Sequence, residues 1–306
     1  MQKENHNHSV FDVLDGQAPM TTFSLFWMVF LVFLWAGNAV VVKIAVRDIP
    51  PLWAAFFRFT PTLPFIALFI IRFGNGFNIT YSEGLRILKL SLIMVVQIWL
   101  LNLGSMYTTG GRVALFLFSF PILVPLMGPM LIKNEYLNKY KIIGCIVALV
   151  GLITAMWGNL GAAEQSTLKG DLIELASCVL LALLMTYNKR LAQHIDKWKI
   201  LFWEFIIAVP LFLVGAVLYE DIQIDMVQTD AWAALFFQSI VVGVFCWMSL
   251  QYLLAKHNAT SVSIYFFLTP IFGMIISALL LHESPDSGLI LGCLFVGMGI
   301  YIVTKY

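Results

Sequence analysis

The sequence is short of charged residues. Asp, Glu, Lys and Arg make up only 11% of its 306 residues, whereas hydrophobic residues make up 60% and the mean hydropathy is +0.89. A soluble globular domain has about 25% charged residues, so this chain has too few polar groups to cover a surface in water. The composition excludes an ordinary water-soluble domain and predicts that the protein lies in a lipid bilayer. The net charge of +1 gives no reason to expect a nucleic-acid partner.

Other absences narrow the function. The G-x-x-x-x-G-K-[ST] motif that binds nucleotide phosphates does not occur, so we do not expect direct drive by ATP. The five histidines lie on the tails or at the ends of apolar runs, which argues against an intramembrane enzyme, and no metal or other cofactor is expected. The four cysteines all lie within apolar runs and do not form the pattern of a disulfide framework.

The chain has instead a series of long apolar runs. A transmembrane helix needs about 20 predominantly apolar residues, and ten runs meet this requirement. They cover residues 22–46, 52–73, 86–107, 112–132, 139–157, 171–191, 199–219, 231–255, 260–281 and 288–304. The predicted fold class is an all-α membrane protein with ten transmembrane helices. A polar tail at residues 1–21, which lacks the pattern of a signal peptide, precedes them.

Lys and Arg are distributed unevenly between the two sides of the membrane that these spans define. Thirteen of the 18 fall on the side of both termini, four fall on the opposite side, and Arg58 lies inside a span. Cytoplasmic loops carry an excess of Lys and Arg. Both termini are therefore predicted to be cytoplasmic in a multi-pass protein of the inner or plasma membrane.

The two halves of the chain resemble each other. A shift of 146 residues aligns Lys43 with Lys189 and Arg58 with Glu204. A shift of 148 or 149 residues aligns prolines and glycines of the later helices: Pro121 with Pro270, Gly144 with Gly292, and Gly151 with Gly299. We predict two five-helix repeats at residues 22–157 and 171–306, joined by an external linker at 158–170. Because five is odd, the second repeat enters the membrane from the opposite side, as in many secondary transporters with a site between inverted repeats.

Specific segments resemble a known family. Residues 34–59 read LWAGNAVVVKIAVRDIPPLWAAFFRF, residues 269–283 read TPIFGMIISALLLHE with Glu283 placed 13 residues after Pro270, and residues 292–300 read GCLFVGMGI. These segments resemble the drug/metabolite transporter superfamily, specifically its ten-helix proteins with two EamA domains. One departure is the 14-residue separation of Pro121 and Glu135 in the first half. The resemblance implies transport of small metabolites, often export of amino acids or related compounds.

Charged and polar side chains inside the predicted spans are candidates for a substrate path. A charge at the centre of a spanning helix costs about 2.5–3.5 kcal/mol. Arg58 lies roughly 10 Å deep at 1.5 Å per residue, so we predict that it faces a cavity or is paired. Lys43 lies near the outer end of its helix, where it either contributes to the site or extends its amine to the headgroups. The candidate substrate-binding residues are Trp35, Asn38, Lys43, Arg58, Gln97, Trp99, Asn102, Glu204, Gln238, Trp247 and Tyr265.

Arg58 and Glu204 occupy equivalent positions in the two repeats with opposite charge. We predict that they line or gate the two ends of the substrate path, where Arg58 binds the carboxylate and Glu204 the ammonium of a zwitterion. The alternative is that each makes a fixed local bond within its own half. For the uncharged polar residues the alternative is hydrogen bonding between helices, and for the aromatic residues it is core packing. Prolines such as Pro61 and Pro121 are predicted to kink their helices.

The sequence thus predicts a secondary-active or facilitative transporter, not an enzyme, that moves small amphipathic metabolites by alternating access. Exported amino acids or their derivatives are the favoured substrates. The alternatives are nucleosides, sugars, S-adenosyl compounds or cationic drugs and, more distantly, an intramembrane enzyme or a channel. Protons are one option for the coupling ion, with Glu204 or Glu174 as the carrier, although Glu174 is expected to be solvated near a helix end. No obligate protein partner is predicted.

Overall fold

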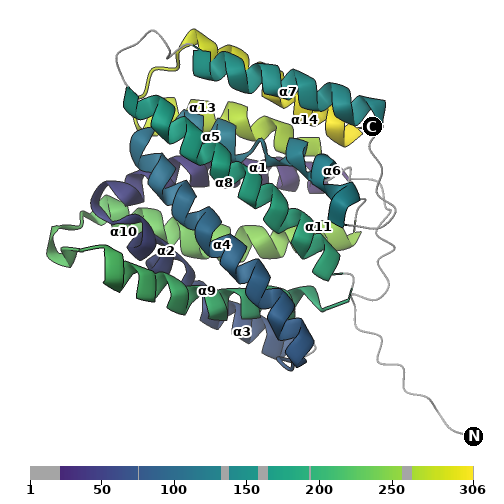
Figure 1. Ribbon diagram of the computed structural model, residues 1–306, viewed down its shortest axis with the longest axis vertical. Helices are drawn as coiled ribbons and strands as arrows, with labels where there is room; N and C mark the ends of the chain where they lie inside the picture. Colours follow the sequence, from purple (N-terminus) through teal and green to yellow (C-terminus); the bar gives the residue numbers. More distant parts are fainter. Residues whose placement is uncertain are drawn as a thin grey trace, which may run out of the picture.

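The computed structural model describes residues 21–74, 76–131, 138–157, 165–192, 194–256 and 264–305. Within these ranges the regular elements are helices (Figure 1). The first half contains α1 (Thr22–Asp48), α2 (Pro51–Phe59), α3 (Thr62–Phe73), α4 (Tyr81–Tyr107), α5 (Gly110–Leu117), α6 (Phe120–Leu131) and α7 (Lys139–Trp157). The second half contains α8 (Gln165–Leu191), α9 (Lys197–Tyr219), η1 (Ile224–Met226), α10 (Thr229–Phe236), η2 (Phe237–Cys246), α11 (Trp247–Lys256), η3 (Ile264–Leu268), α13 (Thr269–Leu280) and α14 (Ser287–Lys305).

Several helices begin at a polar capping residue placed directly before an apolar run. Thr80 and Glu83 form a reciprocal capping box at the start of α4, with N···O distances of 3.3 and 2.6 Å. Asp196 accepts from the Trp198 N–H at 2.9 Å at the start of α9. Such caps satisfy backbone donors that have no partner inside the helix. The polar residues between the runs therefore define where these helices start.

Six helical stretches in the described ranges are long and apolar enough to cross a membrane. They are Thr22–Asp48, Pro51–Arg72, Tyr81–Tyr107, Gly110–Leu131, Lys197–Tyr219 and Thr229–Leu250. Shorter apolar helices occupy Thr269–Leu280 and Ser287–Val303. The expected runs at 139–157 and 171–191 coincide with α7 and with most of α8. These helices support a multi-pass membrane protein, while the count of ten spans stays a prediction.

Several of the expected spans are not continuous α-helices. The expected run at 52–73 is divided into α2 and α3 at Thr60–Pro61, and the run at 112–132 into α5 and α6 just before Pro121. A short 3-10 helix, η3, precedes α13, whose first turn contains Pro270. Between α10 and α11, residues Phe237–Cys246 form a π-helix. Proline has no N–H and removes one hydrogen bond from an α-helical ladder, and two of the breaks lie beside Pro61 and Pro121. A proline does not by itself end a helix here, since Pro125 lies within the continuous α6.

The helices α7 and α14 pack closely through glycines, and Figure 1 shows them side by side. A Cβ added at Gly144 would lie 2.8 Å from the Gly299 carbonyl oxygen, and one added at Gly299 would lie 2.6 Å from that of Gly144. Gly151 and Gly292 stand in the same relation, at 2.9 Å in both directions. Small residues let membrane helices approach in this way. A shift of 148 residues converts one glycine pair into the other.

A second pair of contacts follows the same shift. The Cys145 thiol donates to the Ile122 carbonyl at an S···O distance of 3.2 Å, and the Cys293 thiol donates to the Pro270 carbonyl at 3.7 Å. These cysteines belong to a smaller apolar core that joins α5, α6, α7 and α14, whereas α1, α2, α4, α9 and α10 contribute to the main core. Corresponding side chains of the two halves therefore make corresponding contacts.

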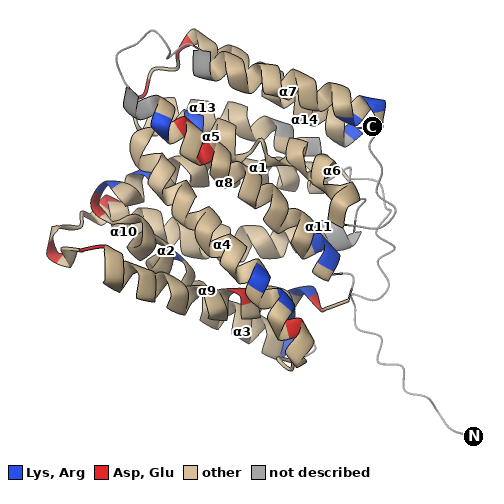
Figure 2. Cartoon of the chain, in the orientation of Figure 1, with Lys and Arg blue, Asp and Glu red and all other residues tan. Residues whose placement is uncertain are grey.

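Charged residues lie mostly toward the two ends of the helices, and the middle of most helices is uncharged (Figure 2). At one end lie the starts of α4 and α9 with the C-terminal end of α14, and at the other lie the starts of α5 and α8. This pattern is typical of helices whose central parts lie in hydrocarbon. The exceptions in the interior are the candidates for function.

Candidate functional site

Arg58 lies in the last turn of α2, beside the break that precedes α3 and against the π-helical segment η2. Its carbonyl oxygen accepts from Ser239 Oγ at 2.7 Å and from Thr62 Oγ1 at 3.1 Å. Thr62 Oγ1 also lies 3.4 Å from the Ser239 carbonyl oxygen. Irregular helix geometry of this kind often accompanies a functional site, and discontinuous helices form the substrate sites of many transporters.

The side chains of Arg58 and Gln238 carry unpartnered donors at this junction. Arg58 is only 8% exposed, and its Nε and Nη1 atoms have no hydrogen-bond partner among the described residues. The Nε2 atom of Gln238, from η2, is likewise buried without a described partner. The Arg58 guanidinium carbon lies 5.0 Å from the centre of the Phe59 ring. A buried donor without an acceptor is costly, so a ligand with acceptor atoms, such as a carboxylate, fits these groups chemically.

Aromatic side chains from three elements meet near the middle of α1. Trp35 contacts Trp247 with ring centres 6.0 Å apart and Phe266 with ring centres 5.5 Å apart. Tyr265 precedes Phe266 in η3 and is half-buried. Asn38 lies one turn after Trp35 on α1, and its Oδ1 atom is buried without a described partner. Two of the predicted aromatic candidates are thus in contact, and a predicted polar candidate lies close to them on α1.

Two other candidates are satisfied by bonds between helices. Gln97 Nε2 donates to Ser177 Oγ at 2.9 Å, and Ser177 Oγ lies 3.1 Å from the Gln97 carbonyl oxygen. Asn102 Nδ2 donates to the Pro51 carbonyl at 2.8 Å. Both side chains are buried, so helix packing already accounts for them.

Trp99 occupies a different face of α4 from Gln97 and Asn102. It is 38% exposed and shares an outward stripe with Leu92 and Val96. This position separates Trp99 from the aromatic contacts around Trp35 and favours a lipid-facing side chain.

Glu204 is buried on α9, which packs against α2. Its carbonyl oxygen accepts from Ser91 Oγ at 3.2 Å. The rings of Phe59 and Phe205, which follow Arg58 and Glu204 in the chain, lie 4.9 Å apart. No ion pair joins Arg58 to Glu204 in the part of the chain that the structure describes.

Five charged side chains meet at one end of the helices. We refer to the following residues as the charged cluster: Lys43, Arg112, Asp171, Glu283 and Asp286. Arg112, in the first turn of α5, is 1% exposed and donates to Asp171 Oδ2 at 2.7 Å and to Asp286 Oδ2 at 2.8 Å. Thr108 Oγ1 donates to the other oxygen of Asp171 at 2.6 Å. The guanidinium is thus held between α8 and the connection from α13 to α14.

Lys43 and Glu283 form the other part of the charged cluster. Their Nζ and Oε1 atoms lie 3.5 Å apart, and the Lys43 amine also donates to the Thr108 carbonyl. Glu283 Oε2 accepts from the Gly110 N–H at 2.8 Å and from the Ser277 hydroxyl. The interpretation that Lys43 extends its amine to the lipid headgroups is therefore wrong, because the amine is bonded to protein groups.

Asp286 lies between α13 and α14. Burial raises the pKa of its carboxyl, but the hydrogen bond and charge of Arg112 and the Leu289 N–H bond outweigh this effect, so the pKa falls below its usual range. The charged cluster joins α1 and α5 of the first half to α8 and the α13–α14 connection of the second. Sequence reasoning missed Arg112 and Asp171 because charges near the ends of apolar runs are normally solvated. A signal was available in the sequence, since Arg112 and Asp171 have opposite charges and begin two expected spans, 112–132 and 171–191, on the same predicted side of the membrane.

Glu174 corrects a second expectation. Its side chain on α8 is 0% exposed rather than solvated, because Gly104 and Ser105 of α4 pack directly against it. Ser105 Oγ donates to Glu174 Oε1 at 3.1 Å, whereas Oε2 has no hydrogen-bond partner among the described residues.

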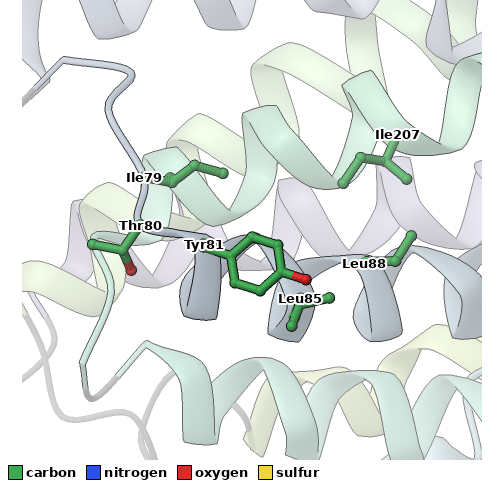
Figure 3. A pocket seen from close by; sticks show the side chains of 7 residues that line it. Ile79, Thr80, Tyr81, Leu85, Leu88 and Ile207 are labelled. Carbon is green, nitrogen blue, oxygen red and sulfur yellow. The ribbon is translucent and has the colours of Figure 1, made fainter.

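One hollow lies apart from these residues, and a second lies beside the charged cluster. A groove of about 350 Å³ between the start of α4 and α9 is lined mainly by apolar side chains, including Ile79, Leu88 and Ile207 (Figure 3). A cavity of about 10 Å³ beside Glu283 and Ser277 is no larger than one water molecule requires. Neither hollow is lined by Arg58 or Gln238.

The long apolar helices support a multi-pass helical membrane protein. Residues 22–157 and 168–305 each match the EamA-like transporter family, so the chain belongs to that family of membrane transporters.

Known proteins are similar to the chain over most of its length. An Archaeoglobus fulgidus protein named an uncharacterized transporter is 25% identical over 274 residues, which cover 89% of this chain and 93% of that protein. An Escherichia coli protein named "probable amino-acid metabolite efflux pump" is 23% identical over 283 residues, which cover 89% and 91% of the two chains. A solved crystal structure shares the fold with a TM-score of 0.65 at 15% identity, covering 93% of this chain and 98% of that one.

Proposed function

We propose that this transporter has ten transmembrane helices arranged as two inverted five-helix repeats, at residues 22–157 and 171–306. The two family matches and the glycine and cysteine contacts that correspond under one shift of 148 residues support this arrangement. A two-fold relation in the membrane plane accounts for both, since it exchanges each contact with its equivalent. In this arrangement the site lies between the repeats and alternates between the two sides of the membrane.

In the proposed orientation both termini are cytoplasmic, and the polar tail at 1–21 and the linker at 158–170 lie on opposite sides of an inner or plasma membrane. The excess of Lys and Arg on the side of the termini supports this orientation. The charged cluster then lies at the outer end of the helices, where its ion pairs hold the two halves together. The Arg58 junction lies deeper in the bundle.

The proposed substrate is a small amphipathic metabolite, most favourably an amino acid or derivative, which the protein exports. The observation that carries this proposal is the set of three buried donor nitrogens on Arg58 and Gln238 that have no partner among the described residues, because a carboxylate supplies the acceptors that they lack. Glu204 provides the counter-charge for an ammonium group, and Trp35 with Trp247 provides apolar surface. The name of the Escherichia coli relative supports the same substrate class.

The energy source is proposed to be a substrate gradient or protons, with Glu204 and Glu174 as the carboxyl groups able to carry a proton. One alternative to the proposed export of amino acids is facilitated movement without protons. Another is transport of a nucleoside, sugar, S-adenosyl compound or cationic drug. An intramembrane enzyme or a channel is the more distant alternative. No protein partner enters the proposed cycle.

The test uses purified protein in lipid nanodiscs. Its thermal stability is measured against amino acids, nucleosides, sugars and quaternary amines, since a ligand that binds the folded state stabilises it by RT ln(1 + [L]/Kd). We expect stabilisation by one or more amino acids, lost in Arg58→Gln and retained in the matched control Arg47→Gln, which changes an exposed arginine. Hits in proteoliposomes should show saturable, competable uptake. Stabilisation by sugars or nucleosides alone would contradict the substrate class, and non-saturable flux would indicate a channel.

A further inference from the structure

The carboxyl group of Glu174 is fully buried where α8 packs against α4. Its side chain is 0% exposed, and a Cβ built at Gly104 would lie 2.7 Å from Oε1 and 2.9 Å from Cγ. Ser105 supplies one hydrogen bond to Oε1, and Oε2 has no described partner. A water molecule needs two to four polar partners and room of its own. A ligand that completes this carboxyl without needing space is a proton.

Among the residues that the structure describes, the charged and titratable groups around Glu174 offer it no free cation. On α8 its neighbours are Asp171, one turn earlier, and Cys178, one turn later. On α5 the Arg112 guanidinium is already bonded to Asp171 and Asp286, and α6 carries no charged or titratable residue over Phe120–Leu131. At this end of α4 the titratable group is Tyr107, and the Lys169 amine lies over its ring at 3.9 Å. An ionised carboxylate in this setting would be buried without compensation.

Short contacts connect Glu174 to the charged cluster. Ser105, which bonds Glu174, lies one turn before Thr108, and Thr108 Oγ1 donates to Asp171 at 2.6 Å. Asp171 in turn holds Arg112 at 2.7 Å. The charged cluster contains two cations and three carboxylates, so it is already one negative charge in excess. Ionising Glu174 would add a second excess negative charge one turn from Asp171.

We propose that Glu174 is a proton-binding site, and that the proton on its carboxyl holds the charged cluster in the closed arrangement. In this arrangement the ion pairs of the cluster are formed as in the structure. The inference rests on the proposed transport cycle and assigns its proton to one of the two candidate carboxyl groups. The reaction is reversible: a carboxylate oxygen takes a proton from hydronium and leaves water, and it returns the proton when the charged cluster separates and water reaches it. Because protonation favours the closed form, opening favours release by the same factor.

The experiment measures conformation rather than transport. Spin labels are placed on Arg47→Cys and Ser284→Cys, two exposed positions on opposite halves beside the charged cluster, and their distance distribution is recorded in nanodiscs from pH 5 to pH 9. The four native cysteines are buried and suited to remain unlabelled. For the unmodified site we expect the ratio of long to short distances to rise at least about tenfold with pH. Glu174→Gln, which mimics the protonated acid, should keep the short distance at every pH.

Two controls make the result decisive. Glu204→Gln should retain the full pH response, because Glu204 lies on α9, away from the charged cluster. Its carbonyl oxygen accepts from Ser91, which lies nearer the other end of α4 than Ser105 does. Glu174→Met, which is also neutral, should behave like Glu174→Gln and replaces it if that variant does not fold. Three results would overturn the proposal. They are a label distance that does not change with pH in the protein that keeps Glu174, a pH response that is unaltered in the Glu174 variants, and a pH response that is lost only in Glu204→Gln. A pH-dependent opening that Glu174→Gln abolishes, in a protein that moves none of the tested metabolites, would instead refute the proposed function alone.

Discussion

Arg112 and Arg58 are both buried guanidinium groups, but their surroundings differ. Arg112 is enclosed in the charged cluster with carboxylate oxygens at 2.7 and 2.8 Å. Arg58 lies beside a helix break and a π-helical segment, and two of its nitrogen atoms have no described partner. The Arg112 guanidinium finds its acceptors within the protein, whereas the Arg58 guanidinium needs a ligand to supply acceptors for these two nitrogen atoms.

The difference separates stability from recognition. Removing one member of a satisfied buried ion pair leaves the other charge stranded, which costs about 3–5 kcal/mol. Removing a donor that already lacks a partner strands nothing. Residues that bind a ligand therefore contribute little to the stability of the free protein, and sites of function are where local rules of satisfaction are broken.

The largest expected effect on stability comes from removing Arg112, whose hydrogen bonds are satisfied within the protein. Arg112→Met should destabilise the protein by about 3–5 kcal/mol, because it leaves Asp171 buried and without its cation. Thermal or denaturant unfolding in detergent measures this loss. The double variant Arg112→Met/Asp171→Asn should recover a substantial part of it, and a double variant less stable than Arg112→Met would contradict the pairing.

The second effect concerns the unsatisfied side. Arg58→Gln should leave the free energy of unfolding within about 1 kcal/mol of its original value while weakening binding of the identified metabolite at least about tenfold, or 1.4 kcal/mol. Isothermal titration together with unfolding separates the two quantities. A large loss of stability with unchanged binding would assign Arg58 to the structural class of Arg112.

A smaller effect is expected at the more accessible part of the charged cluster. The side chains of Lys43 and Glu283 are 21% and 19% exposed and their charged atoms lie 3.5 Å apart, so Lys43→Met should cost only about 1 kcal/mol. The loss should shrink at high salt, as expected for a partly solvated pair. A cost equal to that of Arg112→Met would show that exposure does not set the difference.

The smallest effect is expected from the pH dependence of Asp286, whose carboxyl has a lowered pKa. A lowered folded-state pKa gives stability that is present above the unfolded-state pKa and is lost as pH falls through the folded-state value. The difference in Tm between the original protein and Asp286→Asn should therefore be greatest near neutral pH and shrink as the solution is acidified. A difference that grows on acidification would have the wrong sign.

Much of the helical framework could be predicted from local sequence. Apolar runs such as 199–219 are long enough to form helices in lipid whatever their neighbours are, and α9 spans Lys197–Tyr219. The aligned glycines Gly144 and Gly292 predicted a recurring geometry, and both lie at close contacts between α7 and α14. The candidate substrate-binding residues stay a prediction. The sequence did not indicate which of them share a helix face: Gln97 is buried, whereas Trp99, two residues later on α4, is exposed.

The sequence by itself determined that the chain lies in a lipid bilayer, that it is helical and to which family it belongs, because these properties depend on composition, run length and local motifs. Only the tertiary structure decided which polar groups are paired. Arg112 and Asp171 are 59 residues apart, and Glu174 is buried because a glycine on another helix gives it room. Pairing and burial depend on which helix faces approach each other, and no local pattern encodes the distance between two atoms on different helices.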